Sequence, residues 1–242
     1  MPLRFDLGEF MNRPFSRRKN LARLVISLVV ACLFFILMAC GDDSSSGASL
    51  KTGLLIDERD GQSYKTVTIG KQVWMAENLN YKTEGSFCYG DDPANCTKYG
   101  RLYVWVAAID MPEEECGSDR DCEISGVVQG VCPAGWHLPT KDEFETLITS
   151  AGGIKTAGIK LRTASGWSYD KGEDTYGFSA LPAGNRVNEN IYGDVGDGAW
   201  FWSSSEILTH DAYCLGLWFN DDDVGLGRRS KREAISVRCI KN

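Results

Sequence analysis

The feature that most constrains this chain is an uncharged apolar segment near its N-terminus. Leu24 to Ala39 reads LVISLVVACLFFILMA, and the residues before it are rich in arginine and lysine. A positive stretch followed by such an apolar run is typical of a secretory signal. The run is slightly short for a membrane-spanning helix, which needs about 20 residues. We therefore expect the rest of the chain to fold outside the cytoplasm, where disulfides form and persist.

The end of the apolar segment, Leu37-Met38-Ala39-Cys40, resembles a lipobox, in which a cysteine that follows a small residue receives diacylglycerol. Met38 is bulkier than the usual residue at its position. We expect residues 1–39 to be a lipoprotein signal peptide and Cys40 to be the lipidated first residue after cleavage. The membrane is then a partner through the lipid anchor. An uncleaved signal anchor is the alternative.

A polar stretch follows this cysteine. Gly41 to Ser49 reads GDDSSSGAS, which is too polar and flexible to pack a core. We interpret residues 40–50 as the lipidated cysteine and a flexible linker. From the two acidic residues in this linker we hypothesise an outer-membrane location, with the domain facing the periplasm or the cell surface. Both Met1 and Met11 fit as the start of the chain.

Residues 51–242 have the size of one globular domain. All seven tryptophans of the chain lie between Trp74 and Trp218, which indicates a packed core. Removing the six basic and two acidic residues of segment 1–39 from totals of 26 and 33 leaves 20 basic and 31 acidic residues, a net charge of −11. Such a surface repels phosphate backbones, so we expect no nucleic-acid partner.

The clearest predicted helix begins after Thr140. Thr140 and Glu143 match a capping box, in which the hydroxyl and the carboxylate each accept a hydrogen bond from the other residue's backbone. The apolar residues of the first turns then recur at helical spacing: Phe144, Leu147 and Ile148. Gly152-Gly153 ends this helix. A weaker helix is predicted over Ile154 to Leu161.

The remaining pattern predicts mostly short strands. Tyr64 to Ile69 and Gln72 to Met75 read as a β-hairpin around a Gly-Lys turn. Residues 82–100 and 110–131 read as loops on either side of the apolar run Leu102 to Ile109. Further strands are predicted at Phe178–Leu181, Ala199–Ser203, Ala212–Phe219 and Ala234–Ile240. One or two helices among many short strands indicate an α+β fold.

Five segments, in order along the chain, carry a family resemblance. They are IDERDGQSYKTVTIGKQVWMAENLNY from Ile56, VCPAGWHLPTKDEF from Val131, FSALPAGNR from Phe178, WFWSSSE from Trp200 and SVRCIKN from Ser236. Together they resemble the Fibrobacter succinogenes major paralogous domain, from about Leu55 to Asn242, which is essentially the whole domain. The resemblance implies an antiparallel fold, stapled by disulfides, of the C-type-lectin-like and sulfatase-modifying-factor group. It implies no established biochemical activity.

Seven cysteines lie in the domain behind the linker, and spacing alone does not fix how they pair. Two pairs bracket polar loops and are close enough to bond locally: Cys88 with Cys96, and Cys116 with Cys122. The fold that the chain resembles brings the chain ends together, which implies a bond between Cys132 and Cys239. Cys214 is then left over. The cysteines show no C-x2-C pair and the chain has two distant histidines, so we expect no metal site and no cofactor.

Three tryptophans are candidate ligand contacts: Trp200, Trp202 and Trp218. Aromatic faces pack against the C–H faces of sugars, but tryptophan also fills protein cores. Trp200 and Trp202 have the same parity in the sequence WFW, so they would point to the same side of a strand. These residues therefore favour a carbohydrate platform or a tryptophan-rich core.

Two further motifs have both a functional and a structural interpretation. His137 lies close to Cys132 in sequence, which suggests a nucleophilic Cys–His pair, but we favour an imidazole that satisfies polar groups at the start of the helix. Asn220 to Asp223 supplies oxygen ligands of the kind that Ca²⁺ prefers. We favour a solvated acidic turn there.

We expect a non-catalytic binding or adhesion module whose partner is a polysaccharide or an envelope protein. A structural envelope protein without a specific ligand is the first alternative. The second is a relative of formylglycine-generating oxidases, which work through two cysteines close together near the C-terminus. Cys214 and Cys239 are too far apart in sequence to match that spacing.

Overall fold

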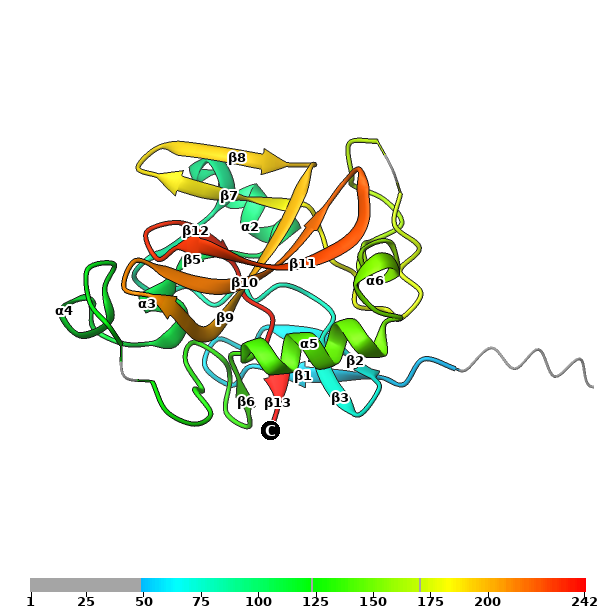
Figure 1. Ribbon diagram of the computed structural model, residues 1–242, viewed down its shortest axis with the longest axis horizontal. Helices are drawn as coiled ribbons and strands as arrows, with labels where there is room; N and C mark the ends of the chain where they lie inside the picture. The colour runs from blue at the N-terminus through cyan, green and yellow to red at the C-terminus, as the bar shows by residue number, and fades with distance from the viewer. Residues whose placement is uncertain (1–48, 123, 170) are drawn as a thin grey trace, which may run out of the picture. The chain divides into compact units, whose positions relative to one another are not determined.

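The computed structural model describes residues 49–122, 124–169 and 171–242, which form two β-sheets with short helices packed on them (Figure 1). The first sheet has the strand order β1-β2-β3-β13-β6, and its pairs are antiparallel. Its strands are β1 (Thr52–Ile56), β2 (Ser63–Ile69), β3 (Gln72–Met75), β6 (Trp136–His137) and β13 (Ile240–Lys241). The hairpin predicted from the sequence is confirmed as β2 and β3.

The second sheet is larger and has the order β11-β10-β9-β12-β5-β4, with β7 attached to β12 and β8 to β7. Its pairs are antiparallel apart from the parallel bridge between β12 and β9. Its strands are β4 (Ser86–Phe87), β5 (Leu102–Val104), β7 (Ala183–Asn188), β8 (Ile191–Val195), β9 (Gly198–Leu208), β10 (Asp211–Trp218), β11 (Asp221–Ser230) and β12 (Ala234–Ser236).

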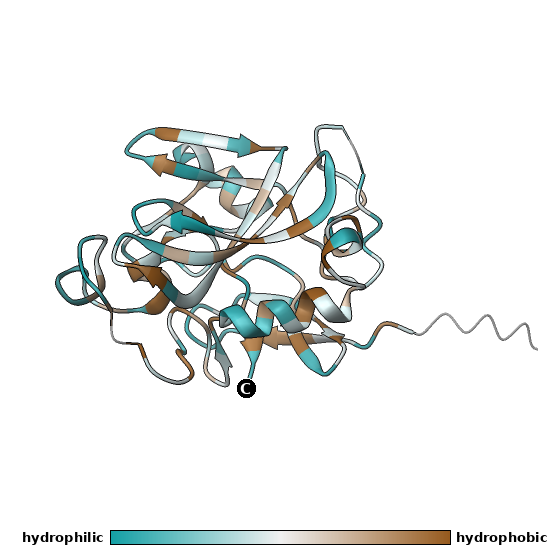
Figure 2. Ribbon diagram, viewed as in Figure 1, coloured by the Kyte–Doolittle hydropathy of each residue, from teal (hydrophilic) through white to brown (hydrophobic). Residues whose placement is uncertain are grey.

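The described helices are all short. They are α2 (Pro93–Tyr99), α3 (Trp105–Ile109), α4 (Glu113–Cys116), α5 (Lys141–Ser150), α6 (Ile154–Leu161) and the 3-10 turn η1 (Tyr89–Asp91). The predicted capping box of α5 is confirmed, because Glu143 N–H donates to the Thr140 hydroxyl at 3.2 Å and Thr140 N–H donates to the Glu143 carboxylate at 2.8 Å. Figure 2 shows polar and apolar residues side by side along α5, as expected of a helix with one buried face.

Two apolar clusters lie on opposite sides of strands β9 and β10. On one side, which we call the helix side, α5 and α6 pack on residues such as Phe201 and Leu215. On the other, which we call the loop side, α3 and the segments around it pack on residues such as Trp202 and Cys214. Alternate residues of one strand therefore enter different cores, as the twofold period of a strand requires.

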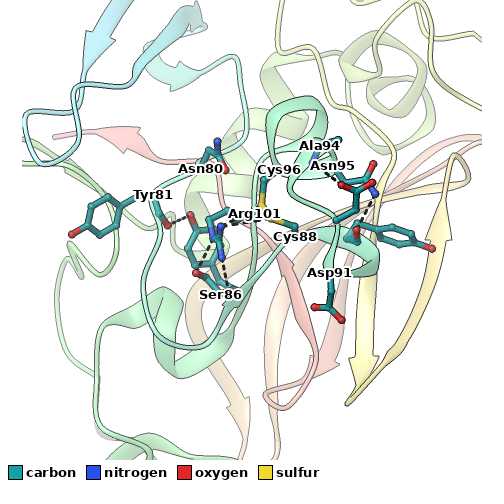
Figure 3. Close-up of a disulfide and its surroundings, with 12 residues drawn as sticks. Asn80, Tyr81, Ser86, Cys88, Asp91, Ala94, Asn95, Cys96 and Arg101 are labelled. Atoms are coloured by element: carbon teal, nitrogen blue, oxygen red, sulfur yellow. Dashed lines mark hydrogen bonds between the residues drawn. A yellow bond between two sulfur atoms is a disulfide. The ribbon is translucent and has the colours of Figure 1, made fainter.

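The described residues hold three disulfides, which pair the cysteines as expected: Cys88–Cys96, Cys116–Cys122 and Cys132–Cys239. Cys214 is a buried free thiol. Figure 3 shows the first bond with Arg101 beside it, whose guanidinium donates to the Ser86 carbonyl oxygen at 2.9 Å and lies 3.3 Å from the sulfur of Cys96. The bond between Cys132 and Cys239 spans 107 residues of sequence.

Several short elements depart from the sequence prediction. The region 82–100 is not a simple loop, because it contains β4, η1 and α2. Asp92 caps α2 through the Ala94 N–H at 2.9 Å and Pro93 occupies its first turn, a start signal that the sequence analysis missed. The region 110–131 contains α4, and the apolar run from Leu102 divides into β5 and α3. The described residues therefore hold more helices than the one or two expected.

The strand prediction was also wrong in places. Phe178 to Leu181 is not a strand, since it forms only an isolated bridge between Ala180 and Arg162. The run from Ala234 divides into β12 and β13, which belong to different sheets. Strands β7, β8 and β11 were missed because their polar and glycine-rich sequences lack apolar alternation.

The predicted signal peptide, Cys40 and nearly all of the predicted linker lie outside the described residues. Within the described ranges, no helix is long and apolar enough to cross a membrane.

Candidate ligand-binding face

Trp200 lies on the loop side of the second sheet, where small residues make room for it. Trp200 on β9 is opposite Gly216 on β10, which is opposite Gly225 on β11. A Cβ at position 216 would lie 2.4 Å from a ring carbon of Trp200, so only glycine lets the indole lie against β10. A Cβ at position 225 would meet nothing within 4 Å, which means that the surface is open there.

Trp218 lies beside Trp200 and uses a second glycine in the same way. A Cβ at Gly198 would lie 2.7 Å from the ring of Trp218. The ring centroids of Trp200 and Trp218 are 5.6 Å apart with the planes tilted by 45°. Both indoles are partly exposed. The glycines opposite and beside them, Gly216 and Gly198, are the signal in the sequence for this arrangement.

The aromatic contacts continue along the surface. Phe219 lies 5.9 Å from Trp218 by ring centroid, and Tyr169 lies 5.4 Å from Phe219. Tyr169 is 79% exposed, which is unusual for an aromatic side chain that contacts another. We call Trp200, Trp218, Phe219 and Tyr169 the aromatic row. Tyr169 and Phe219 were not among the residues that the sequence analysis proposed.

Arg229 on β11 supplies the charged part of this face. Its guanidinium carbon lies 3.9 Å from the centre of the Trp200 ring, while the group donates to Glu233 at 2.9 Å and lies 3.7 Å from the Asp194 carboxylate. Trp200 therefore holds the guanidinium in place, and the Tyr169 ring, 79% exposed, is open to a ligand. The face combines apolar rings with fixed hydrogen-bonding groups, which is the usual composition of a ligand site.

The third candidate tryptophan is not part of this face. Trp202 points to the same side of β9 as Trp200, as the parity predicted, but it is fully buried. Its indole N–H donates to the Tyr103 carbonyl oxygen at 2.7 Å. Trp202 is a core residue because α3 and β5 cover this end of the strand, so its proposed role as a ligand contact is wrong.

His137 is buried and bonded on both sides. Its Nδ1 lies 2.6 Å from the side-chain oxygen of Asn242, and its Nε2 lies 2.8 Å from a carboxylate oxygen of Glu143. Burial opposes a charge on His137, but the two hydrogen bonds and the Glu143 charge outweigh it and raise its pKa. Burial likewise opposes the charge of Glu143, but its bonds to His137 and Thr140 lower its pKa. The nearby Cys132 is bonded to Cys239, so no free thiol stands there.

The acidic turn beginning at Asn220 uses its carboxylates locally. Asp222 lies 3.3 Å from the guanidinium of Arg162, Asp223 pairs with Lys155, and Asp221 accepts the Asp223 N–H at 2.9 Å. In the part of the chain that the structure describes, no group of three or more histidine, cysteine, aspartate or glutamate side chains is placed to hold a metal ion.

Comparison with known proteins gives one match. A sequence model of the family described as the Fibrobacter succinogenes major domain matches residues 67–241. The match includes every residue of the aromatic row and all three disulfides. No curated protein and no solved structure matches.

Proposed function

The chain belongs to the Fibrobacter succinogenes major domain family, and from that premise we propose that it is a non-catalytic binding module for carbohydrate, held at the cell envelope by lipid on Cys40. Residues 51–242 are the module, of C-type-lectin-like type. The meeting of the chain ends in one sheet, through β1 and β13, supports that fold group. An envelope protein is the alternative ligand.

The observation that carries the proposal is the aromatic row. Exposed rings stack on the apolar faces of sugars, while a guanidinium and carboxylates bind the hydroxyl groups. Neighbouring rings of the row are tilted by 45°, 47° and 38°. Because the rings are not coplanar, they cannot all lie on one flat crystalline surface. The row therefore suits a single, flexible glycan chain.

Binding of soluble polysaccharides to the full chain in detergent tests this proposal. We expect Trp218→Ala and Tyr169→Ala each to weaken binding by about tenfold. The stacking of one aromatic ring on one sugar ring contributes on the order of 1–1.5 kcal/mol to the free energy of binding. Tyr213→Ala is the matched control, because Tyr213 lies on the same strand as Trp218 but points to the other side. Absence of binding across a broad glycan array would favour a structural envelope protein.

The oxidase alternative has less support. Cys239 is bonded to Cys132, and burial raises the pKa of the remaining thiol, Cys214, to about 12. A catalytic cysteine pair needs an accessible thiolate. Oxygen consumption or thiol oxidation by the purified protein would reopen this alternative.

The anchor and its location have separate tests. Cys40→Ser should leave uncleaved precursor or release the protein from the membrane fraction, and wild-type migration of the variant would contradict lipidation. Protease treatment of intact cells tests the proposed outer-membrane location. Digestion of the domain indicates surface exposure, and protection confines it to the periplasm.

A further inference from the structure

Strand β1 ends the first sheet and exposes apolar side chains. The sheet order places β2 on one side of β1 and no strand on the other, within the residues that the structure describes. Leu54 is 64% exposed and Ile56 is 60% exposed.

The hydrogen bonds of the hairpin show which backbone groups of β1 point outward. The carbonyl oxygen of Lys51 accepts from Thr68 N–H at 2.9 Å, so Lys51 faces β2. Successive residues of a strand turn their backbone groups to opposite sides. Gly53 and Leu55 therefore also face β2, and the N–H and C=O groups of Thr52, Leu54 and Ile56 point away from the sheet.

The other sheet edges carry features that discourage pairing, and β1 does not. Strands β4 and β6, at two other edges, are two residues long, and β8 contains Asp194 in the left-handed region at φ 61°. β11 carries three aspartates at its start and two arginines near its end. Charges, irregular backbone and short length are how proteins protect strand edges. The five residues TGLLI of β1 contain no charge, no proline and no bulge.

We propose that β1 pairs antiparallel with β1 of a second copy of this chain, about a twofold axis at Leu54. In this register Leu54 faces Leu54 of the second copy, and Thr52 faces Ile56. Every outward backbone group then meets an outward group, which is the pattern of hydrogen-bonded antiparallel pairs. The exposed leucine and isoleucine side chains lie on one face of the joined sheet and cover each other.

The charges beside β1 favour this direction of pairing. Lys51 precedes the strand. After it, Asp57 is buried and paired with Arg59, which leaves the exposed Glu58 and Asp60 as the net charges. Antiparallel pairing brings the basic end of one copy to the acidic end of the other. Parallel pairing would bring like charges together. The two ends of the strand are therefore complementary to a second copy.

Cysteine cross-linking of the full chain in intact cells tests both the pairing and its register. Leu54→Cys places two thiols on the axis with Cα atoms about 5.5 Å apart, within the range that a disulfide bridges. We expect a dimer on a non-reducing gel that disappears on reduction. Thr52→Cys and Ile56→Cys are matched controls on the same strand, because each would lie about 14 Å from its own copy at about 3.4 Å per residue. They should give no dimer.

Other outcomes overturn the proposal. No dimer from Leu54→Cys, or equal dimers from all three variants, contradicts pairing in this register. An adduct of a different mass assigns the edge to a strand of another protein. Ile154→Cys controls for collision, since Ile154 is 59% exposed on α6. In detergent, Leu54→Lys should give a folded monomer, and Ile154→Lys should keep the wild-type mass.

Discussion

The two sides of strands β9 and β10 are covered in different ways. On the helix side, α5 and α6 supply the apolar residues, and the buried cluster there contains no cysteine. On the loop side, short helices and irregular segments supply them, and the buried cluster includes five cysteines. A helix presents a continuous apolar face, whereas a loop buries less area for each residue that it orders. Covalent bonds thus hold the cover in place where helices do not.

This contrast also explains where the candidate ligand face lies. Helices close most of the helix side, where Phe219 packs at the edge of the buried cluster. The cover of the loop side stops at Trp202 and leaves Trp200 and Trp218 partly exposed beyond it. Glycines at positions 216, 225 and 227 prevent side chains of β10 and β11 from filling the gap. The loop side of the sheet is therefore the side on which ring faces remain accessible to a ligand.

Breaking the longest disulfide should have the largest effect on stability. Cys239→Ser opens a loop of about 107 residues, and in the chain-entropy relation a loop of that size contributes about 4.7 kcal/mol. Chemical denaturation of the variant under oxidising conditions measures the loss. Cys88→Ser is the control, because a loop of eight residues contributes about 2.5 kcal/mol by the same relation. Equal losses for the two variants would contradict the argument from loop length.

A core substitution on the helix side should cost nearly as much but without redox dependence. Phe144 is fully buried on α5 and stacks on Trp74 at 5.5 Å between ring centroids. Phe144→Ala should lower the free energy of unfolding by about 4 kcal/mol through lost burial and a cavity. The measurement is denaturation of wild type and variant with and without reductant.

Reduction of the disulfides and Phe144→Ala should lower the free energy of unfolding independently. The two buried clusters contain different side chains, so the two losses should add to within about 0.5 kcal/mol. A large coupling energy would show that both clusters depend on the disulfides for their stability. The two sides would then differ in packing but not contribute independently to stability.

The sequence predicted the helix side better than the loop side. Thr140 with Glu143 and the spacing from Phe144 to Ile148 carry enough local information to place α5, and the glycine pair ends it. The hairpin of β2 and β3 was also local. The missed strands β7, β8 and β11 contain too many polar and glycine residues to show a period of two, because each has at least one open face or edge.

The candidate site was predictable only in part. Trp200 and Trp218 stood out as residue types, but Trp202 had the same parity as Trp200 and looked equivalent. What separates them is how far α3 and β5 extend over β9, which is a tertiary property. Tyr169 lies in a long loop whose position no local pattern specifies. The pairing of Cys132 with Cys239 came from a family resemblance, since spacing does not contain it.

A smaller, pH-dependent effect is expected where the two sides meet. The Glu143 carboxylate lies 2.8 Å from one ring nitrogen of His137 and the side-chain oxygen of Asn242 lies 2.6 Å from the other, an arrangement that favours the charged imidazole, in which both ring nitrogens donate. The raised pKa of His137 stabilises the fold below its unfolded value of about 6.5, and this contribution disappears as the pH rises through the folded pKa. The lowered pKa of Glu143 means that its charged form stabilises the fold above about pH 4.5. This contribution is lost as the pH falls through the folded pKa of Glu143.

His137→Gln should therefore lower stability most between about pH 4.5 and 6.5, by on the order of 1–2 kcal/mol for a charged hydrogen bond. The difference from wild type should shrink on both sides of that window. Melting temperature measured from pH 4 to pH 9 gives the profile. A difference that does not vary with pH would show that His137 acts through packing alone.

The smallest effect should come from Cys214, the unbonded cysteine of the loop-side cluster. Its substitution tests what a buried sulfur contributes to stability without a covalent bond. Cys214 lies in the same cluster as the bonded cysteines but is 1% exposed and free, and burial raises its pKa to about 12. A neutral, buried thiol packs as a small apolar group. Cys214→Ala removes one sulfur and no covalent bond between residues, so it should lower the free energy of unfolding by about 1 kcal/mol or less.

Labelling with a maleimide tests whether Cys214 is buried in solution. In the folded protein this thiol should stay unmodified over hours at pH 8, and denaturant should expose one reactive thiol per domain, read by mass spectrometry. Rapid modification of the native protein would mean that the loop side opens readily between Trp202 and β11, and that its disulfides hold a cover that still moves.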